Sequence, residues 1–194
     1  MAKAQAKLIG YSLTILLSVI LMISVTALVY SFYTSAIRTE ISQSLNQIAA
    51  SVSDSIVNMH KSSKATDFQP SNYSSILISE IGLSLPSEVA KRNYEVMLIS
   101  PSSLWIGITN FTIDDQNVSS ITDTSGPKIV VQTTQDPIVK VERSLPNMDV
   151  LLQGKSENGE DGELRYYRYN INGTIYDSVV LGKSDILMNV ISSS

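Results

Sequence analysis

The hydrophobic positions are concentrated at the beginning of the chain. No charged residue occurs from Leu8 to Ile37, and most of these positions are apolar. As an α-helix, residues 8–32 would span about 38 Å, which exceeds the hydrocarbon core of roughly 30 Å. The run is too long for a secretory signal, and no Ala-x-Ala cleavage site follows it. The pattern therefore predicts a transmembrane helix over residues 8–33.

Small side chains recur at every fourth position early in this segment, at Gly10, Thr14 and Ser18. This spacing lets two helices approach closely in a bilayer, which would favour self-association through the N-terminal helix. Ser and Thr are also common in membrane helices, where they need no such role. Both interpretations stay open.

Beyond the apolar run, the hydrophobic positions become periodic. Large apolar residues follow one another in steps of 4, 4, 3, 4, 4 and 3, an eleven-residue repeat close to the period of a straight helix. The stripe consists of Ile37, Ile41, Leu45, Ile48, Val52, Ile56 and Met59. We expect one helix from about Leu8 to about His60, amphipathic over residues 34–61. Its stripe fits copies of the same helix or the protein's own C-terminal domain. We favour the latter, because that domain has no other long helix.

The pattern changes again after the helix. Residues 62–92 contain a polar hinge with Pro70, then an expected short helix from about Ser74 to Ile81 that ends at Gly82. Residues 93–194 show short runs rich in β-branched and aromatic residues, separated by turn sequences. The expected strands are residues 94–99, 104–113, 128–134, 138–142, 149–153, 163–169 and 174–181.

The spacing of these runs predicts a small antiparallel β-sandwich or barrel. Asn172-Gly173, between the last two runs, predicts a hairpin. The expected fold class is therefore α+β, with a long N-terminal helix followed by a β domain.

Charge indicates the orientation and argues against one class of partner. The chain has 194 residues and a net charge of −4, and all 18 acidic residues follow the apolar run. Without Lys3 and Lys7, the remainder carries 12 basic and 18 acidic residues, or −6, which argues against nucleic-acid binding. These two lysines, against Arg38 alone after the run, favour a cytoplasmic leader over residues 1–7 and an extracellular chain beyond residue 34. The expected partner of residues 8–33 is the lipid bilayer.

Few residues suggest metal or catalytic chemistry. The chain has no cysteine, which excludes disulfides and thiol catalysis, and one histidine, His60. His60 falls at the expected helix end, where a cation suits the helix dipole, so we expect a structural or surface role. A carboxylate cluster lacks the alternating oxygens of a calcium-binding loop, so we expect a solvated loop there and neither metal nor cofactor. The cluster consists of Glu157, Glu160, Asp161 and Glu163.

An aromatic and basic strip occupies the last two expected strands. It consists of Arg165, Tyr166, Tyr167, Arg168, Tyr169 and Tyr176. Because strand side chains alternate, residues 165, 167 and 169 would share one face and residues 166 and 168 the other. Such a strip could bind a partner or a glycan, but cross-strand packing is the more ordinary explanation.

Four Asn-x-Ser/Thr sequences lie on the side expected to face outward, and they are candidate glycosylation sites. They begin at Asn72, Asn110, Asn117 and Asn172, only slightly more than chance gives in this composition. No phosphate-binding loop, nucleophile elbow or carboxylate pair with a supporting base is visible, so nothing in the sequence asks for an enzyme.

The layout resembles the archaeal type IV pilin and archaellin superfamily, whose members carry a class III signal peptide. Lys3-Ala4-Gln5-Ala6 looks like the family's processing sequence and stands directly ahead of the hydrophobic helix. The segment IGLSLPSEVAKRNYEVMLIS also looks like a phrase of archaeal pilin-like surface proteins. The resemblance implies that a prepilin peptidase cuts between Ala4 and Gln5, before the hydrophobic run.

Two positions depart from the family. Lys7 would be the third mature residue, where the family is usually apolar. Ile9 would be the fifth, where bacterial pilins carry an acidic residue that archaeal members often lack.

The resemblance implies a non-enzymatic subunit of a cell-surface filament, or a minor pilin. Its helix would leave the bilayer and pack with its copies or with other pilin-like subunits, and its β domain would form a glycosylated outer surface. The alternative is a permanently anchored accessory protein, similar in layout to an archaellum stator component, whose β domain binds the S-layer or another subunit. A membrane-bound enzyme or sensor is a poorer third interpretation, because no catalytic constellation is visible.

Overall fold

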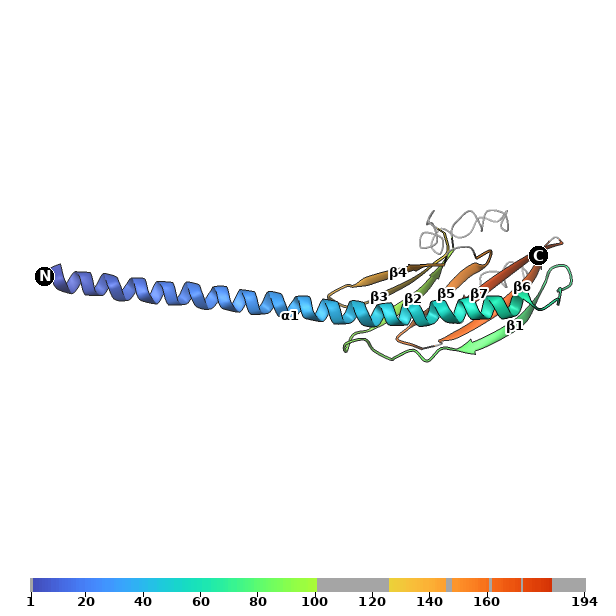
Figure 1. Cartoon of the computed structure of the whole chain (residues 1–194), viewed down its shortest axis with the longest axis horizontal. Coiled ribbons are helices and arrows are strands. Elements are labelled where there is room, and N and C mark those ends of the chain that lie inside the picture. The colour runs from blue at the N-terminus through green and yellow to red at the C-terminus, as the bar shows by residue number, and fades with distance from the viewer. Residues whose placement is uncertain (1, 101–125, 146–147, 161, 172, 183–194) are drawn as a thin grey trace. The chain divides into compact units, whose positions relative to one another are not determined.

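The computed structural model describes residues 2–100, 126–145, 148–160, 162–171 and 173–182. Helix α1 (Ala2–Lys64) comes first and seven strands follow it (Figure 1). The contacts within the chain divide it into two compact units, Met1–Glu40 and Ile41–Ser194. We describe each unit by itself.

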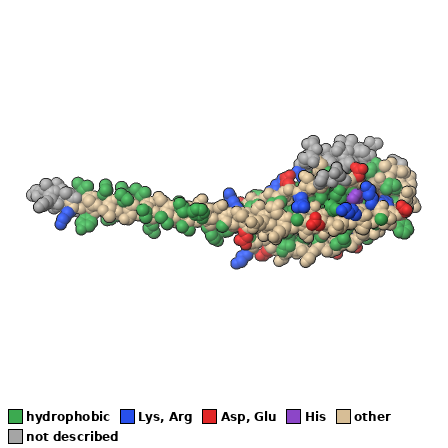
Figure 2. Space-filling model, in the orientation of Figure 1, with side chains coloured by type: hydrophobic (Ala, Val, Ile, Leu, Met, Phe, Trp, Pro, Cys, Tyr) green, Lys and Arg blue, Asp and Glu red, His purple; other side chains and the backbone are tan. Residues whose placement is uncertain are grey.

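The first unit is the N-terminal part of α1, and its apolar side chains are exposed on all sides. From Ile9 to Tyr33, the large hydrophobic residues are between half and three-quarters exposed, and Figure 2 shows them along the helix. Hydroxyl groups bond back to the helix, as where Thr14 donates to the Gly10 carbonyl and Ser18 to the Thr14 carbonyl, each over 2.9 Å. The hydroxyl donors of Thr14 and Ser18 are thus satisfied without water. The helix is long and apolar enough to cross a membrane.

The second unit contains a mixed sheet of seven strands. Its spatial order is β1-β6-β7-β5-β2-β3-β4. The strands are β1 (Ser74–Gly82), β2 (Tyr94–Ile99), β3 (Lys128–Thr133), β4 (Lys140–Ser144), β5 (Leu151–Glu157), β6 (Glu163–Ile171) and β7 (Thr174–Leu181). All neighbours are antiparallel except β5 and β7, which are parallel. Strand β7 therefore enters the sheet between its two predecessors.

The predicted α+β class agrees with the helix and the sheet, but the prediction of purely antiparallel strands is wrong, because β5 and β7 are parallel. The described strands form one sheet, and the sandwich stays a prediction. Local alternation of apolar and polar residues identifies strands but not their partners. Strand β5 changes partner along its length: Leu151–Gly154 pair with β7, and Lys155–Glu157 pair with β2. Through this change, β5 joins the strands on the β7 side to those on the β2 side in one sheet. The sequence alone would equally allow these two groups to form two layers.

The second part of α1 lies along the sheet (Figure 1). Of the predicted stripe, Ile41, Leu45, Ile48, Val52, Ile56 and Met59 are buried, and Ile37, in the first unit, is half-buried. Tyr94, Tyr166 and Tyr169 are the largest fully buried side chains of the sheet. Burying such residues stabilises the unit by roughly 1.5–3 kcal/mol for each large apolar side chain. Copies of the helix are therefore not needed to cover residues 41–59.

The predicted short helix over Ser74–Ile81 is wrong, because these residues form strand β1. Strand β1 pairs with β6 along its whole length, from Ser74 opposite Asn170 to Gly82 opposite Glu163. A short Ser- and Ile-rich segment fits either structure locally, and its partner lies far along the chain. The tertiary pairing therefore decides its conformation.

The other described strands lie within a few residues of their predicted positions. Strand β4 begins and ends two residues later than expected, and β5 extends four residues beyond its expected end. The predicted hairpin is confirmed, because β6 and β7 pair up to Ile171 opposite Thr174. The strand expected at residues 104–113 lies outside the described residues.

Candidate functional site

A buried arginine joins the end of α1 to the sheet. Arg168, on β6, is 8% exposed, and its Nε lies 2.8 Å from Oδ1 of Asp177 on β7. A second guanidinium nitrogen lies 3.3 Å from Oδ2 of the same carboxylate. The planar guanidinium therefore meets the carboxylate with two parallel bonds, the geometry that favours arginine over lysine.

The remaining donors of Arg168 reach the backbone where α1 ends. They donate to the carbonyls of Thr66 at 2.6 Å, Phe68 at 3.2 Å and Ser63 at 3.5 Å. The last carbonyls of a helix have no partner within it, so a cation there satisfies them and suits the helix dipole. Asn170, two residues further along β6, donates to the Pro70 carbonyl at 3.0 Å. Strand β6 thus binds three carbonyls of the connection from α1 to β1, those of Thr66, Phe68 and Pro70.

His60, on α1, and Tyr166, on β6, form a second polar contact between the helix and the sheet. His60 is 9% exposed, and its Nδ1 lies 3.0 Å from the hydroxyl oxygen of the fully buried Tyr166. Burial first, and then the charge of Asp177 and a hydrogen bond to it, raise the pKa of Tyr166. Either group can donate in this contact, because the role of each His60 ring nitrogen depends on the tautomer.

Burial also lowers the pKa of His60, and the neighbouring charge of Lys64 lowers it further, while Asp177 and Asp149 partly oppose both. Of the two roles expected for His60, structural or at the surface, the buried position agrees with the structural one, although the helix continues to Lys64. The cluster of His60, Tyr166, Arg168 and Asp177 pairs its charges internally. Its chemistry is that of a structural lock between helix and sheet.

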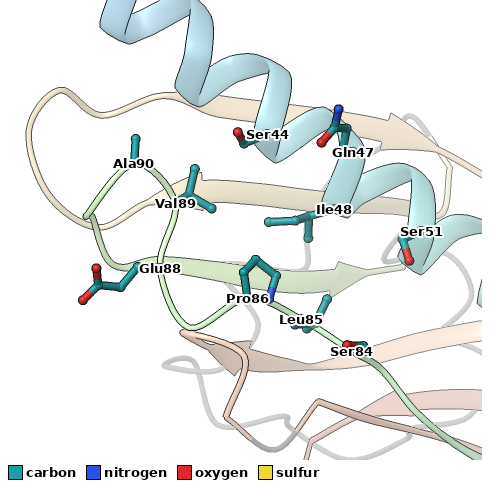
Figure 3. Close-up of a pocket in the computed structure, with 10 residues that line it drawn as sticks. All are labelled: Ser44, Gln47, Ile48, Ser51, Ser84, Leu85, Pro86, Glu88, Val89 and Ala90. Atoms are coloured by element: carbon teal, nitrogen blue, oxygen red, sulfur yellow. The ribbon is translucent and has the colours of Figure 1, made fainter.

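A groove of about 360 Å³ lies beside α1, between the helix and the segment that joins β1 to β2 (Figure 3). Ile48 and Val89 are buried at its apolar side, and Leu85 is half-buried. Its lining also includes Ser44, Gln47, Ser51, Ser84, Pro86, Glu88 and Ala90. Tyr94 fixes one wall, because its hydroxyl donates to the Pro86 carbonyl at 2.5 Å. The groove is lined by uncharged hydrogen-bonding groups and one carboxylate, that of Glu88.

The predicted carboxylate cluster is divided among ion pairs. Glu157 lies 2.7 Å from Lys155, and Glu163 pairs with Arg165. Asp161 lies outside the described residues, and Glu160 is exposed. Among the residues that the structure describes, no three His, Cys, Asp or Glu side chains gather as a metal site would require.

The aromatic and basic strip is divided between the two faces of the sheet, as strand alternation predicts. Tyr166 and Arg168 contact the end of α1. On the other face, the rings of Tyr167 and Tyr169 lie 5.8 Å apart, and Tyr169 stands opposite Tyr176. Arg165 pairs with Glu80 on β1 at 3.0 Å. Cross-strand packing accounts for these contacts.

The other predicted sites are placed as follows. Residues 3–5, with the predicted cleavage position between Ala4 and Gln5, belong to α1. Gly10 has open space where a side chain would begin. Asn72 is exposed in the connection before β1. The sequences at Asn110, Asn117 and Asn172 include residues that are not described.

Sequence reasoning missed the groove and the pairing of Arg168 with Asp177. The Arg168–Asp177 pair could have been predicted, because the hairpin expected at residues 172–173 places Arg168 opposite Asp177. The groove had no such signal, because its two walls come from parts of the chain that only the fold brings together.

The fold and the site together describe an architecture. One long N-terminal helix is apolar and exposed in its first part. Its second part is buried on a mixed sheet, and an arginine holds it there. Comparison of the chain with protein-family models, with curated proteins and with solved structures found no match.

Proposed function

We propose that this protein is a pilin-like subunit of an archaeal cell-surface filament, or a minor pilin, with a structural or adhesive role and no enzymatic activity. The single observation that carries the proposal is the division of α1. Its first part exposes large apolar side chains on every side, and from Ile41 onward its apolar stripe is buried in the second unit. The first part therefore needs lipid or other helices around it.

Assembly would exchange one apolar environment for another. In the bilayer, lipid surrounds residues 8–33, with the N-terminus in the cytoplasm and the β domain outside. In a filament, helices of other copies would replace the lipid, and close packing would add dispersion energy. Gly10, Thr14 and Ser18 supply a narrow face for such packing, and their hydroxyls are already bonded within the helix.

The N-terminus of the mature protein tests this proposal. Mass spectrometry of protein from native cells should find Gln5 as the first residue, because a prepilin peptidase would cut after Ala4. Ala4→Leu should block the cut and leave a slightly larger protein, whereas Ala2→Leu, outside the bond, should not. A native N-terminus at Met1 or Ala2 would contradict the filament proposal.

Lys7 favours a second candidate, the permanently anchored accessory protein. Its side chain is exposed at the start of the helix, and in a filament it would enter an apolar core as a charge. In a bilayer, the same ammonium would reach the cytoplasmic headgroups. Filaments sheared from cells decide between the candidates: they should contain the chain if it is a subunit. If it is anchored, the membrane fraction should retain all of it.

A further inference from the structure

One exposed sequence motif remains outside the proposed filament role. Asn72-Tyr73-Ser74 is an Asn-x-Ser sequence in the connection between α1 and β1. All of Asn72, Tyr73 and the preceding Ser71 are exposed, and Ser74 begins β1. The motif therefore lies on the surface of the second unit, where a modifying enzyme and its product have room.

The side chain of Asn72 has a fixed orientation. Its Oδ1 accepts hydrogen bonds from the backbone N–H of Tyr73 at 3.2 Å and of Gly173 at 3.1 Å. Because both partners are donors, the carbonyl oxygen and not the amide nitrogen must face them. The Nδ2 atom consequently points the other way, and it makes no hydrogen bond to the described part of the chain. Nδ2 is the atom that carries an N-linked glycan.

The surrounding backbone is held in place without help from Nδ2. Arg168 holds the Thr66 and Phe68 carbonyls, Asn170 holds that of Pro70, and the Ser74 hydroxyl donates to the Ser71 carbonyl at 2.6 Å. A substituent on Nδ2 would break none of these bonds. The neighbouring hairpin surface, Gly173 to Ile175, is exposed and carries no charge. The folded corner can therefore carry a bulky, hydrated group.

We propose that Asn72 is an N-glycosylation site and that its glycan covers the corner between the end of α1 and the β6–β7 hairpin. The proposal rests on the proposed function only for the location of the β domain outside the cell. The donor would be a lipid-phosphate- or lipid-pyrophosphate-linked oligosaccharide, used by a membrane transferase. Nδ2 attacks the anomeric carbon, the bond from that carbon to the phosphate oxygen breaks, the lipid phosphate leaves with the electron pair, and a base of the transferase takes one Nδ2 proton.

Trypsin gives a direct test, because cleavage after Lys64 and Lys91 releases residues 65–91 as one peptide. Asn72 is the only asparagine in that peptide, so any N-linked mass on it belongs to this residue. We expect the peptide from native cells to carry added sugar mass. Ser74→Ala should abolish that mass and keep the Asn72 contacts, whereas Ser74→Thr, which preserves the motif, should retain it.

An unmodified 65–91 peptide from native cells would overturn the proposal. Parallel labelling of intact cells with a membrane-impermeant amine reagent shows whether the β domain lies outside the cell. It therefore separates a wrong site from a wrong location. If the lysines of the β domain are labelled, the Asn72 proposal alone is wrong. If they are not labelled, the outer location in the proposed function is wrong as well. Added mass that persists in Ser74→Ala would also overturn the assignment.

Discussion

Arg168 shows how one side chain can connect three elements. Its guanidinium bridges the Asp177 carboxylate on β7 and three carbonyls at and beyond the end of α1. Removal of the arginine would leave Asp177 without its partner in a site that is largely closed to water, and would also free the carbonyls. Breaking such a pair costs more than the pair itself contributes, because the remaining charge stays desolvated.

We therefore expect Arg168→Ala to lower the free energy of unfolding by about 3–5 kcal/mol. Arg143→Ala is the matched control: Arg143 is exposed on β4, so its removal should change stability by no more than about 0.5 kcal/mol. Denaturant unfolding of the full chain in detergent micelles measures both. Equal stability of the two variants would mean that the lock contributes little.

His60 gives the second unit a pH dependence of known sign. Its pKa in the folded chain lies below the ordinary histidine value of about 6.5, so between the two pKa values the unfolded chain binds more protons. The contribution of His60 to stability is therefore complete above about pH 6.5 and decreases as the pH falls toward the folded pKa. His60→Asn should remove this contribution, because its amide can donate to Tyr166 from the position of Nδ1 but does not titrate.

The measurement is the free energy of unfolding at pH 7.5 and pH 5 for the native chain and for His60→Asn. The native chain should lose more stability between these values than the variant loses. Identical losses would show that His60 titrates in the folded chain as it does in the unfolded one.

At the scale of elements, the position of Gly154 in β5 explains how this strand can pair first with β7 and then with β2. Gly154 ends the pairing with β7 and has a φ of 97°, and a Cβ atom there would overlap the backbone carbonyl of Leu181. The next residues of β5 pair with β2. A glycine at this point lets the backbones of β5 and β7 approach closely while β5 changes partner.

Gly154→Ala should therefore destabilise the protein strongly. Gly126→Ala is a close control, because Gly126 has the same φ of 97° but open space around it. Both variants pay the cost of a left-handed alanine, about 1–2 kcal/mol. Only Gly154→Ala adds the overlap, which we expect to cost at least about 2 kcal/mol more. Thermal unfolding of both proteins measures the difference, and equal losses would contradict the close approach.

Local sequence patterns predicted the elements better than their partners. The eleven-residue stripe identified the large apolar side chains of α1 that are buried from Ile41 to Met59, because helical periodicity is a local property. Strand β1 was predicted as a helix, because its partner β6 lies far along the chain. The groove was not predicted for the same reason, because its walls come from segments that lie far apart in the sequence. By contrast, the Arg168–Asp177 pair follows from a hairpin that the sequence does predict.

For the whole molecule, the two units have opposite requirements. The first exposes its large apolar side chains, and the second buries its own core of helix and sheet residues. Chains that contain residues 34–194 alone should therefore be soluble without detergent and fold with a β-rich circular dichroism spectrum. The full chain should need detergent or lipid. Aggregation of the shortened chain would mean that its fold depends on the N-terminal part of α1.

The pairing of β1 with β6 has a consequence for the order of synthesis. Strand β1 leaves the ribosome early, but Gly82 pairs with Glu163 and Ser74 with Asn170, which are made much later. At about 5–20 residues per second, the interval is roughly 4–20 s, and α1 and β1 wait through it without their partner strand. The fold therefore depends on contacts between residues far apart in the chain, which slow folding, and the sheet can be completed only after the last hairpin has been made. Until that moment the apolar stripe of α1 lacks the sheet that covers it, so the unfinished domain is prone to aggregate.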